Sequence, residues 1–126
     1  MKEKFYICKH CGNIVSMIED KGTPLSCCGD KMTELVANTS DGATEKHVPD
    51  VKVEGDKVVV QVGSVIHPMT EEHHIAWICL ITNKGSQFKY LSVTDEPKAQ
   101  FTLNEDEKPK AVYEYCNLHG LWKKEI

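Results

Sequence analysis

Two groups of cysteine and histidine residues have the types and spacing that metal chemistry requires. The first group consists of one C-x2-C pair and one pair of adjacent cysteines: Cys8, Cys11, Cys27 and Cys28. Four thiolates at this spacing can surround a single tetrahedral metal ion. Gly12 and Gly29 directly follow the two pairs, where a residue without Cβ can adopt a positive φ and turn backbone N–H groups toward sulfur. The pattern predicts a metal knuckle that takes zinc or iron.

A disulfide framework is the alternative interpretation of six cysteines in 126 residues. Residues 1–7 are charged and too short for the apolar region of a signal peptide, and no later stretch is long and apolar enough to span a membrane. We therefore expect a cytoplasmic protein with reduced thiols and favour a metal over disulfides.

The second group lies in the rest of the chain. Cys116 and His119 are three residues apart at the end of a predicted strand, so that both can reach one metal ion. His67 and His73 flank a loop between strands, and His47 is expected to begin the first strand of this region. A lone histidine is more often an ordinary surface or core residue than a ligand. Together with the thiolate, however, these residues predict a second metal site.

The number of donors in the second group limits the choice of metal. Four imidazoles and one thiolate exceed the four ligands of a closed structural zinc site. On an octahedral ion, five ligands leave one position open, and nitrogen donors with one sulfur suit iron. The pattern therefore indicates a redox site for a small oxygen species.

The positioning elements are predicted to be short strands. Residues 51–53 and 58–62 alternate with period two around a turn at 54–57, and residues 75–81 are apolar on both faces. Further runs at 87–93, 99–103 and 111–115 are rich in β-branched and aromatic residues. We expect an all-β protein in which an antiparallel, immunoglobulin-like sandwich of about seven strands follows a small metal-knuckle domain, with no helix.

Composition supports this division and excludes one class of partner. Residues 1–37 hold too few apolar residues for a core of their own, so the metal must stabilise that domain, and residues 38–126 form the second domain. The net charge of −4, without basic patches or glycine-rich phosphate loops, argues against nucleic-acid binding.

The ordered combination of motifs resembles desulfoferrodoxin, the two-iron superoxide reductase family. The resemblance covers the whole chain: the four-cysteine set, then Glu45-Lys46-His47-Val48-Pro49, His67-Pro68-Met69 with His73, and Tyr115-Cys116-Asn117-Leu118-His119-Gly120. It implies a desulforedoxin-like domain with one iron on Cys8, Cys11, Cys27 and Cys28. It also implies a catalytic iron held by His47, His67, His73, His119 and the axial Cys116.

The resemblance also implies the reaction and the partners. Superoxide would be reduced to hydrogen peroxide at the open position of the ferrous site, with electrons from an external donor such as rubredoxin. Lys46 would attract the superoxide anion, and Glu45 would occupy the sixth position of the ferric ion. The family further implies a homodimer that associates through the small domain.

Three other functions remain open. In one, the four-cysteine iron serves a non-catalytic electron carrier; in another, zinc stabilises an interaction module. The third is a superoxide dismutase, which needs no external reductant and evolves oxygen. Three residues are set apart from the ligands: His74 is expected on the opposite strand face from His73, Cys79 as a free buried thiol, and His10 in solvent.

Overall fold

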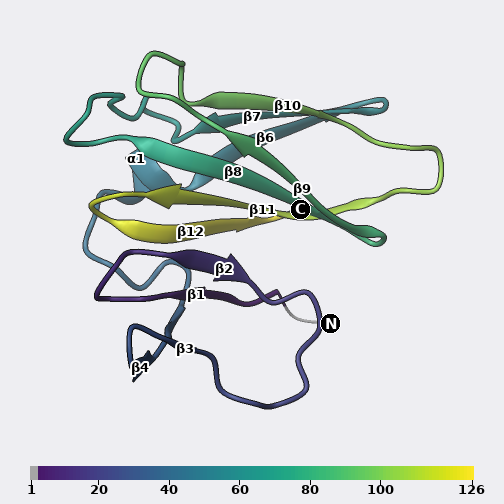
Figure 1. Cartoon of the computed structure of the whole chain (residues 1–126). Helices are drawn as coiled ribbons and strands as arrows, with labels where there is room; N and C mark the ends of the chain where they lie inside the picture. The colour runs from purple at the N-terminus through teal and green to yellow at the C-terminus, as the bar shows by residue number, and fades with distance from the viewer. Residues whose placement is uncertain (1–2) are drawn as a thin grey trace. The chain divides into compact units, whose positions relative to one another are not determined.

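The computed structural model describes residues 3–126, so the first two residues of the predicted N-terminal domain lie outside the described residues. The chain folds into two compact units, of which one ends at Val36 and the other comprises Ala37–Ile126 (Figure 1). Within residues 3–126, no helix is long and apolar enough to cross a membrane.

The smaller unit consists of short strands. A three-stranded antiparallel sheet has the order β2-β1-β5, and β3 and β4 form a separate hairpin. The bounds are β1 Phe5–Ile7, β2 Ile14–Ser16, β3 Ser26–Cys27, β4 Asp30–Lys31 and β5 Thr33–Leu35. Phe5 and Cys8 are its only fully buried apolar residues among those described. So small a core agrees with a fold that depends on bound metal.

The larger unit is a sandwich of two antiparallel sheets, with strand orders β10-β7-β6 and β12-β11-β8-β9 (Figure 1). Its elements are α1 Thr44–His47, β6 Pro49–Glu54, β7 Lys57–Val62, β8 Ile75–Thr82, β9 Gly85–Tyr90, β10 Lys98–Thr102, β11 Pro109–Cys116 and β12 Gly120–Glu125. Alternating residues of β7 and its neighbour β10 face alternating residues of β8 and β11 across one core: Val58, Val60, Val62, Ile78, Leu80, Phe101 and Val112. The all-β prediction is confirmed.

The structure corrects three details of the predicted elements. His47 ends the short helix α1, whereas the sequence pattern placed it at the start of a strand and predicted no helix. Strand β9 begins at Gly85, earlier than predicted. Strand β12 was not anticipated; Gly120, with φ 79°, lets the chain reverse after His119 so that residues 120–125 pair with β11.

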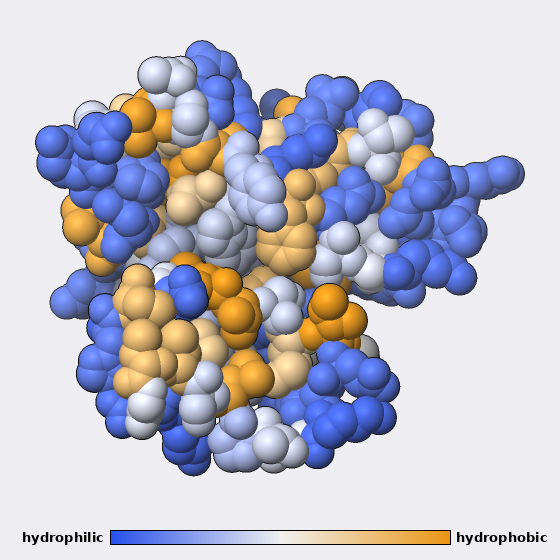
Figure 2. Space-filling view, in the orientation of Figure 1, coloured by the Kyte–Doolittle hydropathy of each residue, from blue (hydrophilic) through white to orange (hydrophobic). Residues whose placement is uncertain are grey.

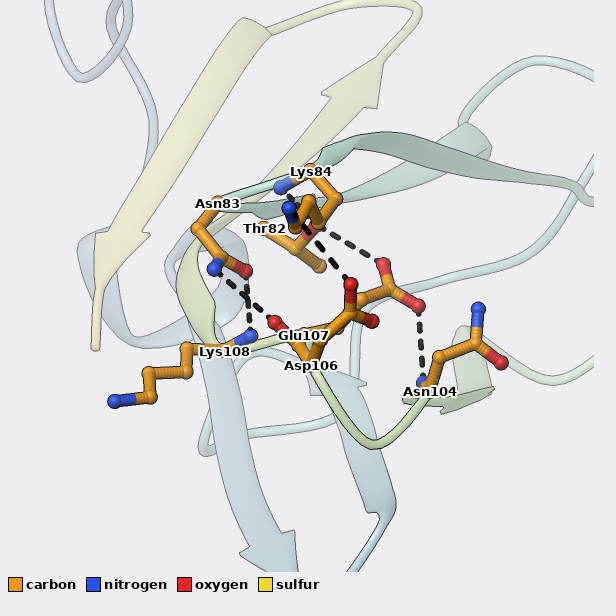
Figure 3. A network of polar contacts seen from close by, with 7 residues as sticks. All are labelled: Thr82, Asn83, Lys84, Asn104, Asp106, Glu107 and Lys108. Carbon is orange, nitrogen blue, oxygen red and sulfur yellow. Dashed lines mark hydrogen bonds and ion pairs between the residues drawn. The ribbon is translucent and has the colours of Figure 1, made fainter.

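The turn between β8 and β9 is tied to the loop before β11 by a polar network (Figure 3). The Glu107 carboxylate accepts hydrogen bonds from the Thr82 hydroxyl at 3.1 Å and the Asn104 N–H at 2.9 Å. Figure 2 shows that hydrophilic residues predominate at this end of the sandwich. The network closes the end of the larger unit away from α1 (Figure 1).

Candidate functional site

The larger unit brings five potential metal donors to one point. One donor atom from each of five residues lies within 4.8 Å of all the others: His47, His67, His73, Cys116 and His119. They come from α1, the segment between β7 and β8, the end of β11 and the turn before β12. The five residues named from the sequence therefore form one cluster.

Hydrogen bonds fix which nitrogen of two rings faces the cluster. His47 Nδ1 lies 2.7 Å from the Ala43 carbonyl oxygen, and His67 Nδ1 lies 2.7 Å from the Pro68 carbonyl oxygen. Because a carbonyl oxygen only accepts, both Nδ1 atoms carry the proton and both Nε2 atoms present bare lone pairs. These two Nε2 atoms lie 3.2 Å apart. Two bare acceptors at this distance need a cation between them.

Protonation of the rings does not supply that cation near neutral pH. Burial lowers the pKa of His47 and of His73, and it lowers the pKa of His67 to about 4. These three imidazoles are thus held in the neutral form that binds metals. Nε2 of His73 is also buried without a hydrogen-bond partner. A metal ion satisfies all of these atoms at once.

The separations between donors fit adjacent positions around one ion. His119 Nδ1 lies 3.0 Å from His47 Nε2, and Cys116 Sγ lies 3.4 Å from His67 Nε2. Metal–nitrogen bonds of about 2.1 Å place neighbouring nitrogens about 3.0 Å apart at a right angle and about 3.4 Å apart in a tetrahedron. The nitrogen distances are at or near the right-angle value. These nitrogen separations suit an ion with more than four ligands, in keeping with a set of five donors.

Cys116 contributes the sulfur from the buried end of β11. Burial raises the pKa of its thiol, while the backbone N–H groups of Leu118 and His119 lower it. A buried thiol with a raised pKa becomes a thiolate only beside a positive charge. The cluster therefore couples thiolate formation to binding of a cation.

Trp122 and Gly42 support the rings from outside the donor set. The Trp122 ring stacks on His47 with 5.0 Å between centroids, and its Nε1 donates to the His119 carbonyl oxygen at 3.0 Å. A Cβ on Gly42 would lie 3.2 Å from His47 Cε1 and 3.2 Å from the Trp122 ring. Only glycine fits here without displacing a ring that carries a donor.

Glu45 and Lys46, the predicted catalytic residues, are both exposed on α1 beside His47. The Glu45 carboxylate does not belong to the donor cluster. Burial is the main cause of the lowered pKa of His73 and of His47, and the positive charge of Lys46 makes a lesser contribution to both. The Glu45 carboxylate acts on the pKa of His47 in the opposite direction, so α1 brings both signs of charge near the cluster.

The smaller unit contains the second cluster. The Sγ atoms of four free cysteines lie within 4.8 Å of one another: Cys8, Cys11, Cys27 and Cys28. Cys27 Sγ lies 3.7 Å from Cys11 Sγ and 4.0 Å from Cys28 Sγ. Metal–sulfur bonds of about 2.3 Å in a tetrahedron place the sulfurs about 3.8 Å apart, whereas a disulfide requires about 2.05 Å. The distances fit a metal and exclude disulfides.

The pKa values of these thiols also favour a bound cation. The backbone N–H of Cys11 lowers the pKa of Cys8 to about 6, whereas contacts with the Cys8 and Cys11 sulfurs raise the pKa of Cys27 to about 12. One thiolate forms readily, and its negative charge then disfavours ionisation of the neighbouring thiols. Four thiolates coexist only around a positive ion.

Backbone geometry explains how adjacent cysteines can share one site. Cys27 ends β3, and the two residues before β4 both have positive φ, 53° at Cys28 and 80° at Gly29. A two-residue hairpin loop with two positive φ values is a type I′ turn. The turn directs the Cys28 side chain toward the same point as Cys27. The expected positive φ of Gly12 is also confirmed, at 85°.

The three residues set apart from the ligands lie outside both clusters. His74 is not in a strand, and its Nδ1 lies 2.9 Å from the Thr70 carbonyl oxygen. Cys79 is a buried free thiol, as expected. His10 is exposed but contacts the Asp30 carboxylate, which the sequence did not predict.

Family comparisons agree with both clusters. The desulfoferrodoxin family model matches residues 39–125, and the model of the desulfoferrodoxin N-terminal domain matches residues 1–35. The chain belongs to the desulfoferrodoxin family. A desulfoferrodoxin from Syntrophotalea carbinolica is 48% identical over 124 residues, which cover 98% of this chain and 97% of the relative.

Solved structures of the family extend the comparison. A superoxide reductase from Treponema pallidum matches with a TM-score of 0.84 and 40% identity over 99% of this chain and 100% of that chain. A one-iron superoxide reductase from Giardia intestinalis matches with a TM-score of 0.57 and 38% identity, over 65% of this chain and 97% of its own. About a third of this chain has no counterpart in the match to that one-iron protein.

The sequence did not identify every residue that shapes the desulfoferrodoxin site. Trp122 and Gly42 were missed because neither is a donor, and Asn117 was read only as part of the terminal motif. Asn117 hydrogen-bonds to both residues that flank His73. An asparagine directly after a predicted cysteine ligand is the signal that could have been followed.

Proposed function

We propose that this protein is a superoxide reductase, which reduces superoxide to hydrogen peroxide at the cluster of four histidines and one cysteine. The observation that carries the proposal is the pair of bare Nε2 atoms of His47 and His67, 3.2 Å apart, with three further donors around the same point. The membership in the desulfoferrodoxin family and the likeness to solved superoxide reductases support the choice of reaction.

The residues of the chain suit two iron ions. Cys8, Cys11, Cys27 and Cys28 would hold one, and His47, His67, His73, His119 and Cys116 the other. When bound by the five donors, ferrous iron supplies one electron and an open position for the anion. The neutral rings would leave the bound ion less electron-rich than carboxylates would, while the Cys116 thiolate would donate electron density to it.

Glu45 and Lys46 would act on the substrate from α1. Lys46 would attract the superoxide anion to a protein whose net charge is −4, and its charge is near enough to the cluster to contribute to the lowered pKa of His73 and His47. By the family resemblance, the Glu45 carboxylate would bind the iron once it is ferric. Both side chains are exposed, so water can supply the protons that peroxide requires.

The remaining assignments are also proposals. We assign residues 1–37 to a desulforedoxin-like iron domain and residues 38–126 to the catalytic domain, in line with the matches to 1–35 and 39–125. A rubredoxin-type protein would deliver the electrons. The protein would be cytoplasmic, where its free cysteines stay reduced, and homodimeric through the smaller unit, where Ile18 and Val36 are exposed.

The test compares the iron and zinc forms of the same chain. Reduced, iron-loaded protein is mixed anaerobically with a pulse of superoxide, and the hydrogen peroxide formed is counted. A reductase yields one peroxide for each superoxide consumed, whereas a dismutase yields one for every two and releases oxygen. Zinc has no redox chemistry, so the zinc form should leave the spontaneous decay of superoxide unchanged. Equal consumption by the two forms, or half the peroxide yield, would contradict the proposal.

A further inference from the structure

The histidine donors differ in how their rings are held. His47 and His67 each bond a backbone carbonyl oxygen through Nδ1. The ring of His73 has no hydrogen bond to either nitrogen within residues 3–126, and its Nε2 is buried. A ring without its own hydrogen bond depends on its backbone for its direction. Some other group must therefore place the backbone at residue 73.

Asn117 forms hydrogen bonds to the two neighbours of His73. The His74 N–H donates to Asn117 Oδ1 at 2.8 Å, and Asn117 Nδ2 donates to the Glu72 carbonyl oxygen at 3.0 Å. The backbone N–H of Asn117 donates to the His74 carbonyl oxygen at 3.2 Å. One asparagine thus brackets His73 on both sides.

The bracket joins parts of the cluster that are distant in sequence. Asn117 directly follows Cys116 and precedes His119 in the same turn, whereas His73 lies more than forty positions earlier. The loop of His73 is closed internally by Thr70, whose N–H donates to the His73 carbonyl oxygen at 2.9 Å and whose hydroxyl accepts from the His73 N–H at 3.1 Å. Those bonds shape the loop but do not connect it to the turn of Cys116.

We propose that Asn117 is a positioning residue that sets His73 relative to Cys116 and His119, and thereby holds the five donors ready for the metal. The inference rests on the proposed metal site, and it assigns Asn117 no contact with metal or substrate. Loss of the Asn117 hydrogen bonds should weaken metal binding, because groups that orient ligands typically change the affinity for the metal by about ten- to a hundredfold.

Asn83 provides a matched control at the other end of the same sandwich (Figure 3). The Lys108 N–H donates to Asn83 Oδ1 at 2.7 Å, Asn83 Nδ2 donates to the Asp106 carbonyl oxygen at 3.2 Å, and the Asn83 N–H donates to the Lys108 carbonyl oxygen at 3.1 Å. The three bonds are the same in kind as those of Asn117, but they bracket Glu107, which is not a member of either cluster. Both asparagines are exposed.

The experiment measures metal release from the full chain. Asn117→Ala, Asn83→Ala and the wild type are loaded with cobalt(II), and the first-order transfer of cobalt to a chelator is followed by absorbance. Cobalt in the four-cysteine cluster has its own spectrum and serves as an internal reference. Release from the five-donor cluster should be about ten- to a hundredfold faster in Asn117→Ala and within about twofold of the wild type in Asn83→Ala.

A double-mutant cycle tests whether Asn117 acts through His73. If it does, adding Asn117→Ala to His73→Ala should change the release rate by less than about twofold, because the ring that it positions is gone. Should Asn117→Ala not fold, Asn117→Ser takes its place. Equal release from the Asn117 and Asn83 variants, or the same acceleration with and without His73, would overturn the inference. A wild type that binds no cobalt in this cluster would instead overturn the proposed function.

Discussion

Glu114 should make the stability of the larger unit fall as pH rises. Its side chain lies in the core, because it is directly opposite the buried Ile78 in the β8–β11 pair and is fully buried itself. Neither carboxyl oxygen has a hydrogen-bond partner within the described residues. Burial raises the pKa of Glu114 from 4.5 to about 9. The carboxyl group is therefore protonated in the folded protein at neutral pH.

The size of the effect follows from the two protonation states. Below pH 4.5 both the folded and the unfolded chain hold this proton, so the folded state carries no penalty. Between pH 4.5 and about 9 only the unfolded chain releases it, and the free energy of unfolding falls by about 1.4 kcal/mol per pH unit. From pH 6.5 to 8.5 the loss is about 3 kcal/mol, a large part of the stability of a typical domain. Above pH 9 the dependence ends.

The assay is urea unfolding of the metal-free, reduced protein at several pH values between 6.5 and 8.5. Metal is removed because a nearby cation would favour the ionised carboxylate. The two tryptophans, Trp77 and Trp122, both belong to the larger unit, so their fluorescence reports its unfolding. Glu114→Gln has the same shape but cannot ionise, so this part of the pH dependence of the free energy of unfolding should vanish. Glu105→Gln, in an exposed turn, is the control and should follow the wild type.

The result that would refute the reasoning is a parallel pH dependence of the wild type and Glu114→Gln. It would mean that Glu114 ionises in the folded protein much as in the unfolded chain. The window above pH 6.5 avoids the buried histidines, whose lowered pKa values make stability rise with pH between about 4 and 6.5.

Five further substitutions test the two clusters. Cys27→Ser should lower the iron content to one ion per chain while superoxide is still reduced; loss of reduction with that iron still bound would contradict two separable sites. Cys116→Ser should abolish the sulfur-to-iron absorption of the oxidised five-donor site, whereas Cys79→Ala should keep the spectrum and lose about 1 kcal/mol of stability in a denaturant titration. Lys46→Ala should slow the reaction with superoxide about three- to tenfold in stopped-flow, with a flatter dependence on ionic strength; an unchanged salt slope would remove the steering role. Gly42→Ala should alter the absorption spectrum of the five-donor site, because its Cβ would lie 3.2 Å from His47 Cε1; an identical spectrum would mean that the loop moves aside instead.

The sequence alone determined the chemistry of both sites and the class of fold. Ligand type is a property of single residues, so Cys116 and His119 at strand-end spacing already indicated a metal. Alternation with period two is equally local, and it identified β7 and β8 together with the sandwich. The resemblance of the ordered motifs then named the family that the comparisons bear out.

Local patterns failed where long-range contacts choose between conformations. Strand β12 forms because residues 120–125 find the edge of β11, although its Lys123-Lys124-Glu125 segment has no apolar alternation. His47 closes a helical turn because α1 is held by tertiary bonds, including the Val65 N–H to the Glu45 carbonyl oxygen at 2.9 Å. Propensity over four residues is too weak to predict such a turn.

Only the tertiary structure decided how the donors are directed and what supports them. Which nitrogen of His47 faces the cluster depends on the Ala43 carbonyl oxygen, and the bracket of Asn117 around His73 joins segments that no sequence window contains. The burial of Glu114 was likewise unforeseen, since a glutamate in a strand is ordinarily placed toward solvent. The sequence determines which residues can act as donors. Their orientation depends on hydrogen bonds between distant segments, and these exist only in the folded chain.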